Sequence, residues 1–193
     1  PIYSDYEKEN NLDSTFEFLN SLAGILITTL FIFTLVVLIF APIFIFIFAP
    51  GFYFDPLKKE ISINVLRIIF PYLALISLVA FAGGIQNTHT KFSLPAFTPV
   101  IFNICLIFAA IFIAPIYEMP IYALAWGVFL AGILQLLIQV LPLWQINRLP
   151  VPKMNMSNLG VKKFFKLILP AILAGGIIQI NLLVDTIFAS FLE

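Results

Sequence analysis

An uninterrupted run of 37 residues, 18–54, contains no Asp, Glu, Lys or Arg. The hydrocarbon core of a bilayer is about 30 Å thick, and about 20 apolar residues in an α-helix cross it. An uncharged run of this length therefore predicts a membrane-spanning helix. As one straight helix the run would reach about 55 Å, which exceeds the bilayer, so we expect a kink or an exit near Pro42. A re-entrant or interfacial segment would then extend to Pro50.

Similar uncharged runs continue along the chain and are separated by short charged segments. They lie between Glu17 and Asp55, Arg67 and Lys91, Lys91 and Glu118, Glu118 and Arg148, and Lys166 and Asp185. These runs predict five membrane helices, near residues 21–48, 65–86, 97–115, 121–146 and 163–191. An odd number of spans puts the two termini on opposite sides of the membrane.

The composition supports the same class of protein. Hydrophobic residues make up 62% of the chain, charged residues make up 10%, and the mean hydropathy is +1.08. A soluble domain has about 25% charged residues. The apolar runs are continuous rather than alternating, which argues against membrane strands and leaves helices. We therefore predict an all-α, polytopic membrane protein.

Residues that carry chemistry are few. The single cysteine, Cys105, has no partner for a disulfide or a thiolate metal site, and the lone His89 lies in a loop without metal-ligand neighbours. The sequence holds no Gly-rich phosphate loop and no recognisable set of nucleophile, base and orienting acid. It therefore predicts neither an enzyme nor a nucleotide-driven motor, and no cofactor.

Lysine and arginine in short loops are biased towards the cytoplasm and so report orientation. Seven of them fall on one side of the five-helix arrangement: Lys8, Lys91, Arg148, Lys153, Lys162, Lys163 and Lys166. Three fall on the other side: Lys58, Lys59 and Arg67. We predict a cytoplasmic Pro1 end and an extracytoplasmic Glu193 end, with Lys58 and Lys59 unusual on the outer side.

The polar segments define the expected domain organisation. Residues 1–20 form a cytoplasmic segment, and residues 21–146 form a first group of membrane helices. Residues 147–162 form a cytoplasmic linker, stiffened by Pro150 and Pro152, and residues 163–193 form the last helix. Acidic residues of the first segment are expected to be a solvated face: Asp5, Glu7, Glu9, Asp13 and Glu17.

Prolines and small residues recur inside the predicted spans. Each span holds one proline at which a kink is expected: Pro42, Pro71, Pro99, Pro142 and Pro170. Small residues four positions apart permit close helix contact: Ala80 with Gly84, Gly127 with Ala131, and Ala171 with Gly175. Tight packing explains this pattern, and the moving helices of a transporter are the alternative.

Asp185 is the one ionisable side chain that the runs place at membrane depth, where such a group faces a cavity or a partner. Asn181 lies one turn before it, and the two predict oxygen ligands for a hard cation such as Na⁺, or a proton relay. Two side chains do not complete a shell, and an interfacial carboxylate is the alternative. Gln135 and Gln139 are expected to bond between helices rather than bind a ligand.

Four ordered groups of residues resemble one family. They are Arg67, Pro71, Tyr72, Gly83, Gly84, Gln86 and Asn87; then Pro95, Thr98, Pro99 and Asn103; then Leu124, Trp126, Gly127 and Gln135; then Leu169, Pro170, Gln179, Asn181, Asp185 and Thr186. Together they resemble the MurJ/MviN family of bacterial lipid II flippases over essentially the whole chain.

The resemblance implies the fold of the multidrug/oligosaccharidyl-lipid/polysaccharide exporters, with about fourteen helices in two lobes. Because the chain starts without methionine and stops directly after an apolar helix, we expect an internal piece: helices three to seven, with residues 147–162 joining the lobes. Asp185 matches a sodium site that some members place on helix seven. The substrate-binding arginines of the family lie on helices outside this chain.

The resemblance implies a flippase that moves undecaprenyl-linked lipid II across the bacterial cytoplasmic (inner) membrane for peptidoglycan synthesis. Membrane potential or a cation gradient would drive it, with Na⁺ as a candidate coupling ion, and no nucleic acid would be bound. An exporter of another polyprenyl-linked polysaccharide or of drugs is the alternative within the fold. An intramembrane lipid-modifying enzyme is the alternative of a different class.

Overall fold

The computed structural model describes residues 3, 6–7 and 12–191, without the side chains of 174, 177, 178 and 181. Its described part contains helices and no strand. The α-helices are α2 (Leu12–Ile39), α3 (Ala41–Phe48), α4 (Pro50–Tyr53), α5 (Pro56–Ile69), α6 (Pro71–Thr88), α7 (Ser93–Phe108), α8 (Pro120–Gln145) and α9 (Leu159–Ala189). A π-helix (Ala109–Ile113) and a 3-10 turn (Ala114–Ile116) continue α7. The all-α prediction is confirmed.

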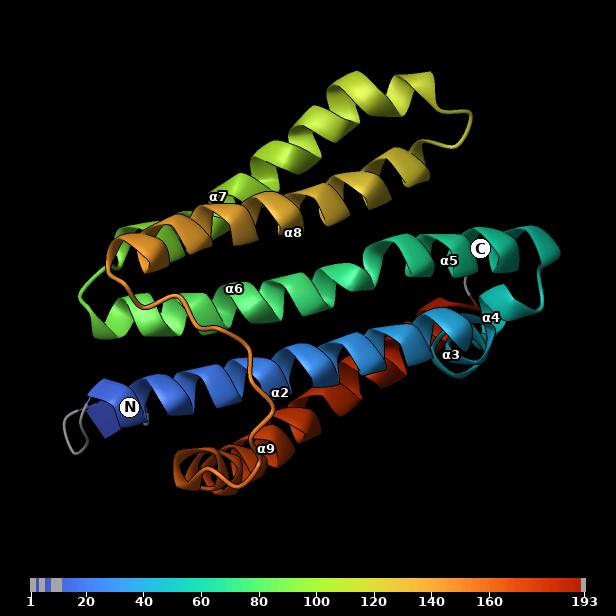
Figure 1. Cartoon of the computed structure of the whole chain (residues 1–193). Helices are drawn as coiled ribbons and strands as arrows, with labels where there is room; N and C mark the ends of the chain where they lie inside the picture. The colour runs from blue at the N-terminus through green and yellow to red at the C-terminus, as the bar shows by residue number, and fades with distance from the viewer. Residues whose placement is uncertain (1–2, 4–5, 8–11, 192–193) are drawn as a thin grey trace.

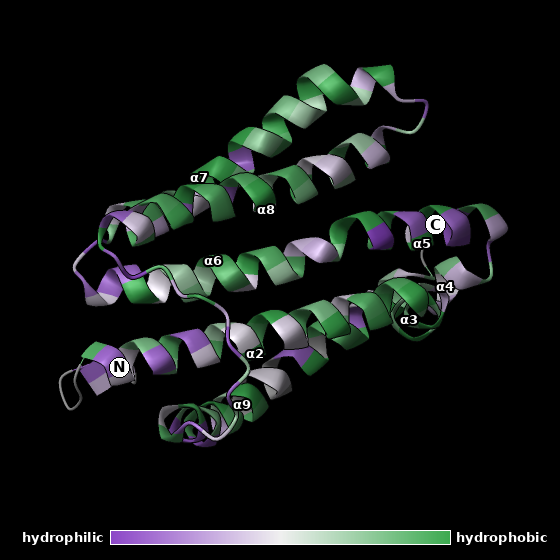
Figure 2. Cartoon of the chain, viewed as in Figure 1, coloured by the Kyte–Doolittle hydropathy of each residue, from purple (hydrophilic) through white to green (hydrophobic). Residues whose placement is uncertain are grey.

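Four helical stretches in the described part are long and apolar enough to cross a bilayer: Leu12–Ile39, Pro56–Thr88, Ser93–Ile116 and Pro120–Gln145. In Figure 2 the ribbons of these stretches are coloured mainly as hydrophobic residues. The fifth predicted span forms a helix, α9, but four side chains in it are not described, so its crossing stays a prediction. The start of α2 and the end of α9 lie at opposite ends of the bundle (Figure 1).

The break expected near Pro42 is confirmed. Helix α2 ends at Ile39 and α3 begins at Ala41. In a continuous helix the Leu38 carbonyl would accept a hydrogen bond from residue 42, but proline has no N–H. Arg67 replaces the missing donor, since its Nε lies 3.2 Å from the Leu38 oxygen.

The second span begins earlier than predicted, at Pro56 instead of residue 65. The Asp55 side chain caps this helix by accepting hydrogen bonds from the amides of Leu57 and Lys58, and Pro56 suits its first turn. The prediction was wrong because charged residues were taken as helix boundaries, whereas the helix continues past the apolar run. A break at Phe70, before Pro71, separates α5 from α6.

Helix α8 packs against α5, α6 and α7 through small residues. A Cβ on Gly132 would lie 2.8 Å from Cδ2 of Tyr72, and a Cβ on Gly127 would lie 2.7 Å from Cβ of Ala109. The close contact predicted at Gly127 is therefore confirmed. At Gly84 and Gly175 nothing lies within 4 Å of the added carbon, so the contacts predicted there are not made among the described residues.

Candidate functional site

Asp185 lies on the last two turns of α9, and its side chain is exposed. Gln179 and Thr186 are exposed as well, and the Thr186 hydroxyl donates to the Leu182 carbonyl of its own helix at 2.7 Å. The polar part of α9 therefore points away from the other described helices. It offers its carboxylate to groups that the described chain does not supply.

The described residues do not complete the predicted cation site. No group of three or more His, Cys, Asp or Glu side chains comes together among them, and the Asn181 side chain lies outside the described part. Hard cations in proteins take about six or more oxygen ligands, and Asp185 supplies two at most. The pairing of Asp185 with Asn181 stays a prediction.

The start of α9 packs against α2. The Asn158 side chain caps α9 by accepting hydrogen bonds from the Gly160 amide at 2.9 Å and the Val161 amide at 3.3 Å. Val161 is buried against Phe18, and a Cβ on Gly160 would lie 2.6 Å from Cδ2 of Phe18. The first turn of α9 is thus part of a hydrophobic core shared with α2.

The extended segment before α9 is hydrogen-bonded to α2 as well. In Figure 1 this segment leaves α8 and passes α6 and α2 on its way to α9. The amide of Val151 donates to Oδ1 of Asn20 at 2.7 Å, and the amide of Lys153 donates to the Asn20 carbonyl at 3.0 Å. A Cβ on Gly24 would lie only 2.3 Å from the Lys153 carbonyl oxygen, so glycine makes this approach possible.

Two further side chains of α2 continue this contact. Oε1 of Glu17 accepts a hydrogen bond from Asn155 at 3.0 Å, and the Thr28 hydroxyl donates to the Met154 sulfur at 3.4 Å. Positions 17, 20, 24 and 28 recur at three- and four-residue steps and so share one helix face. We call these four residues the α2 stripe. Glu17 was predicted to be a solvated side chain, and it is exposed while it accepts this hydrogen bond.

The end of α9 is held more lightly. Ser190, directly after α9, is 5% exposed, and its hydroxyl accepts a hydrogen bond from the Gly51 amide of α4 at 3.0 Å. A Cβ on Gly51 would lie 2.0 Å from the Ser190 carbonyl oxygen. The end of α9 therefore touches α4 backbone to backbone, and only glycine permits it.

Between these two ends α9 stands away from the described helices. Its apolar side chains are largely exposed, for example Ile172, Leu173 and Leu182, and Gly176 has nothing within 4 Å of an added Cβ. Phe164 near the start of α9 still packs against the core shared with α2, and it borders a cavity of about 390 Å³ that side chains of α2 and α6 also line. The middle of α9 is therefore a surface left open to groups from outside the described chain.

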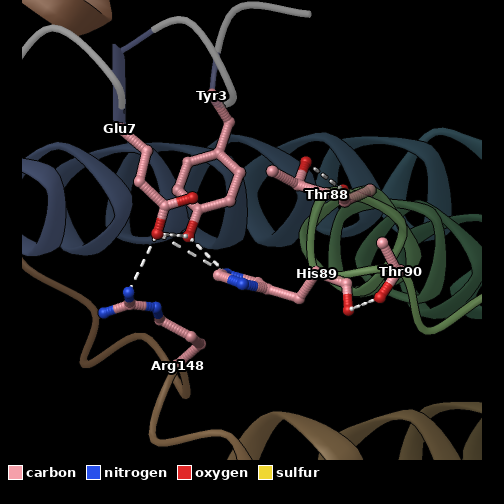
Figure 3. Close-up of polar contacts among 7 residues, drawn as sticks. Tyr3, Glu7, Thr88, His89, Thr90 and Arg148 are labelled. Atoms are coloured by element: carbon pink, nitrogen blue, oxygen red, sulfur yellow. Dashed lines mark hydrogen bonds and ion pairs between the residues drawn. The ribbon is translucent and has the colours of Figure 1, made fainter.

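A polar cluster lies near the start of α2 and joins three distant segments (Figure 3). The Tyr3 hydroxyl lies 2.9 Å from Nε2 of His89 and 3.4 Å from Oε1 of Glu7. Arg148 donates to the same Glu7 oxygen at 2.8 Å, and its guanidinium lies 5.0 Å from the ring centroid of Phe16. This cluster ties the first residues to the ends of α6 and α8.

The cluster corrects one prediction and adds a contact to another residue. Glu7 was expected on a solvated face, but it is paired with Arg148, while Asp5 and Glu9 lie outside the described residues. His89 was expected in a loop without metal-ligand neighbours; it directly follows α6 and contacts Tyr3. Burial, and next the negative charge of Glu7, raise the pKa of Tyr3 to about 12. The hydroxyl therefore stays protonated at neutral pH and remains a hydrogen-bond donor.

The glutamines of α8 join helices, as predicted. Gln135 donates to the Thr98 carbonyl at 2.9 Å, and Gln139 donates to the Thr98 hydroxyl at 2.9 Å. Gln86 of α6 donates to the Gln139 carbonyl at 3.0 Å and to its side-chain oxygen. These side chains are fully buried, and they connect α6, α7 and α8 in the core.

Comparison with known proteins places the whole chain in one family. Residues 1–193 match the profile of the family described as "Lipid II flippase MurJ". A "Probable lipid II flippase MurJ" of Buchnera aphidicola subsp. Acyrthosiphon pisum is 38% identical over 193 residues, covering 100% of this chain and 38% of the relative. A protein of the same description from Haemophilus influenzae is 37% identical, covering 100% of this chain and 39% of the relative.

The description of a third relative omits the word "probable". The "Lipid II flippase MurJ" of Burkholderia cenocepacia is 34% identical over 194 residues, covering 98% of this chain and 38% of the relative. The chain thus spans less than two fifths of the length of these relatives. The exposed middle of α9 is consistent with this difference, because the longer relatives have further residues that could cover such a surface.

Proposed function

The chain belongs to the MurJ family of lipid II flippases, and from this premise we propose that the full-length protein moves lipid II across the bacterial cytoplasmic membrane. The match over residues 1–193 carries the proposal. The chain is part of a multi-pass membrane protein, and its family consists of transporters rather than enzymes. Delivery of the lipid-linked precursor for cell-wall synthesis would be the biological role.

Helix α9 is the element of this chain best suited to border the transport path. Its two ends are attached to α2 and α4, and its middle is exposed. A helix bordering a path must present one side to helices supplied by the rest of the protein. We assign residues 21–146 to the first lobe, residues 147–162 to the linker and residues 163–193 to the first helix of the second lobe.

The orientation has the Pro1 end in the cytoplasm and the Glu193 end outside. The basic residues near the start of α9 support it, because they lie in the loop that carries most of the positive charge. Asp185 then lies towards the outer end of α9. Its exposed carboxylate would supply one ligand of a Na⁺ site whose other ligands come from later helices, so a cation gradient could drive transport.

Complementation tests the proposal. A strain depleted of its own lipid II flippase would receive the full-length gene that contains this segment, with an empty vector as control. Restored growth, mature peptidoglycan and no accumulated lipid II are expected. Failure to rescue despite normal amounts of protein in the membrane would contradict the proposal and favour export of another polyprenyl-linked polysaccharide or of drugs.

A further inference from the structure

A cavity of about 610 Å³ lies where α4, α5 and the end of α9 meet the start of α8. Ile61, Val65, Ile121 and Ala189 make most of its wall apolar. Two polar side chains complete the wall, Lys58 and Ser62. Pockets for small organic ligands measure about 300–1,000 Å³ and combine apolar walls with a few polar groups, so the cavity has the size and lining of a ligand site.

Lys58 and Ser62 lie one turn apart on α5 and so face the same side. Within the described part of the chain, the Lys58 ammonium has no acidic partner and the Ser62 hydroxyl makes no hydrogen bond. The nearest aromatic ring to that ammonium is Phe52, whose centroid is 5.9 Å away. A cation and a hydroxyl donor are thus both available to an anion at the rim of an apolar cavity.

The neighbouring Lys59 provides a contrast. Its ammonium lies 3.9 Å from the ring centroid of Tyr53, which is a close cation–π contact, and it does not line the cavity. The two adjacent lysines therefore differ in degree: Lys59 lies close against its ring, while Lys58 makes a longer cation–π contact with Phe52 and lines the cavity. Basic residues are disfavoured on the outer side of a membrane protein, and Lys58, which has no acidic partner among the described residues, is available there to an anionic ligand.

The position of Lys58 matches the depth of lipid headgroups. It lies in the first turn of α5, which begins at the Asp55 cap, and Tyr53 directly precedes this turn. Tyrosine is enriched at the interface between membrane and water. Ile61 and Val65 follow further along α5, towards the hydrocarbon. A lipid with its headgroup at Lys58 would therefore have a chain alongside these two residues.

We propose that this cavity binds one anionic phospholipid of the bilayer, in the leaflet at the α5 start. The Lys58 ammonium and the Ser62 hydroxyl donate to its phosphate oxygens, and one acyl chain fills the apolar part. A single ammonium balances the single charge of a phosphodiester, whereas a pyrophosphate would leave excess negative charge. The site is therefore distinct from the path of lipid II. It depends on the membrane placement in the proposed function and not on the transported substrate.

The experiment uses the full-length protein, purified and exchanged into phosphatidylglycerol or zwitterionic phosphatidylcholine, with retained lipid counted by native mass spectrometry. Wild type should retain phosphatidylglycerol preferentially. Lys58→Gln should lower this retention about fivefold, while the matched control Lys59→Gln changes it less than twofold. Val65→Trp should displace the lipid although the lysine is intact, and equal thermal stability in detergent would verify folding.

Equal retention by wild type and Lys58→Gln would overturn the site. Equal losses in Lys58→Gln and Lys59→Gln would also overturn it, because they would indicate general surface charge. Tighter, Lys58-dependent retention of undecaprenyl pyrophosphate than of phosphatidylglycerol would overturn the phospholipid assignment in favour of the transported lipid. Complementation tests the proposed function separately: rescue by Lys58→Gln alongside lost lipid retention would support two independent sites.

Discussion

The two ends of α9 are attached to the rest of the chain in different ways. Its start is preceded by a segment bonded along the α2 stripe, and its first turn is buried against Phe18. Among the described residues its end has one hydrogen bond to another helix, from the Gly51 amide to the Ser190 hydroxyl, and it also contacts α3. In a family of lipid transporters, this asymmetry makes the start of α9 a fixed attachment and its end an attachment that a small conformational change can release.

The largest expected effect is at Gly24, in the middle of the fixed attachment. Gly24→Ala places a methyl group 2.3 Å from the Lys153 carbonyl, so the linker must move away from α2. We expect a loss of about 2–3 kcal/mol of stability and faster amide hydrogen exchange at residues 151–155 in the full-length protein. Gly84→Ala is the matched control, since nothing lies within 4 Å there. Unchanged exchange in Gly24→Ala would contradict the fixed attachment.

A smaller effect is expected at Gly51, at the other end. Gly51→Ala separates α4 from Ser190, and the short helix α4 can shift to relieve the overlap, so we expect a loss of about 1–2 kcal/mol. The measurement is deuterium labelling of the backbone amides of residues 187–191 by hydrogen exchange, which leaves the Ser190 hydroxyl intact. Labelling should speed up when Gly51→Ala is added and stay constant when Gly24→Ala is added. Equal acceleration by both changes would show that the two ends are not independent.

Alkaline pH should weaken the fixed end, because Tyr3 packs against the hydrophobic core that holds the first turn of α9. Tyr3 has a pKa raised to about 12 in the folded chain, against about 10 when unfolded. Its protonated form therefore adds stability that is complete below pH 10 and is lost as pH rises through 12. After allowance for solvent screening the loss is about 1 kcal/mol. Thermal unfolding between pH 9 and 12 would measure it, and Tyr3→Phe should abolish this part of the pH dependence.

The smallest effect on stability is expected at Asp185, which is exposed in α9. Asp185→Asn should leave both attachments and the unfolding temperature unchanged, and should weaken the dependence of complementation on Na⁺. Gln179→Glu would serve as a charge control on the same helix. Growth that responds to Na⁺ equally in wild type and Asp185→Asn would remove the proposed coupling role.

Much of the helical architecture followed from the sequence because lipid imposes a simple requirement of length and apolarity. The break at Pro42 was predictable because proline lacks a backbone donor. The bonds of Gln135 and Gln139 were predictable because buried amides need hydrogen-bond partners. The start of α5 was missed because Lys58 and its neighbours stay helical outside the apolar run.

The attachments of α9 were not predicted, because they join residues far apart in sequence. The spacing of Glu17, Asn20, Gly24 and Thr28 on one helix face was a usable signal, but no pattern in residues 151–155 names its partner. The pairing of Glu7 with Arg148 likewise depends on how the ends of α2 and α8 meet. Side chains separated by more than a hundred positions come together only once the helices have packed.

Arg67 donates to the Leu38 carbonyl in place of the N–H that Pro42 lacks, and this affects the order in which the two residues can be substituted during evolution. Pro42 leaves the Leu38 carbonyl without its helical donor, and Arg67 donates to that carbonyl instead. If the proline is lost, the backbone can bond to itself and the arginine becomes dispensable. If the arginine is lost first, the Leu38 carbonyl loses its replacement donor. Natural variation at the two positions should therefore be ordered, with the proline replaced before, or together with, the arginine.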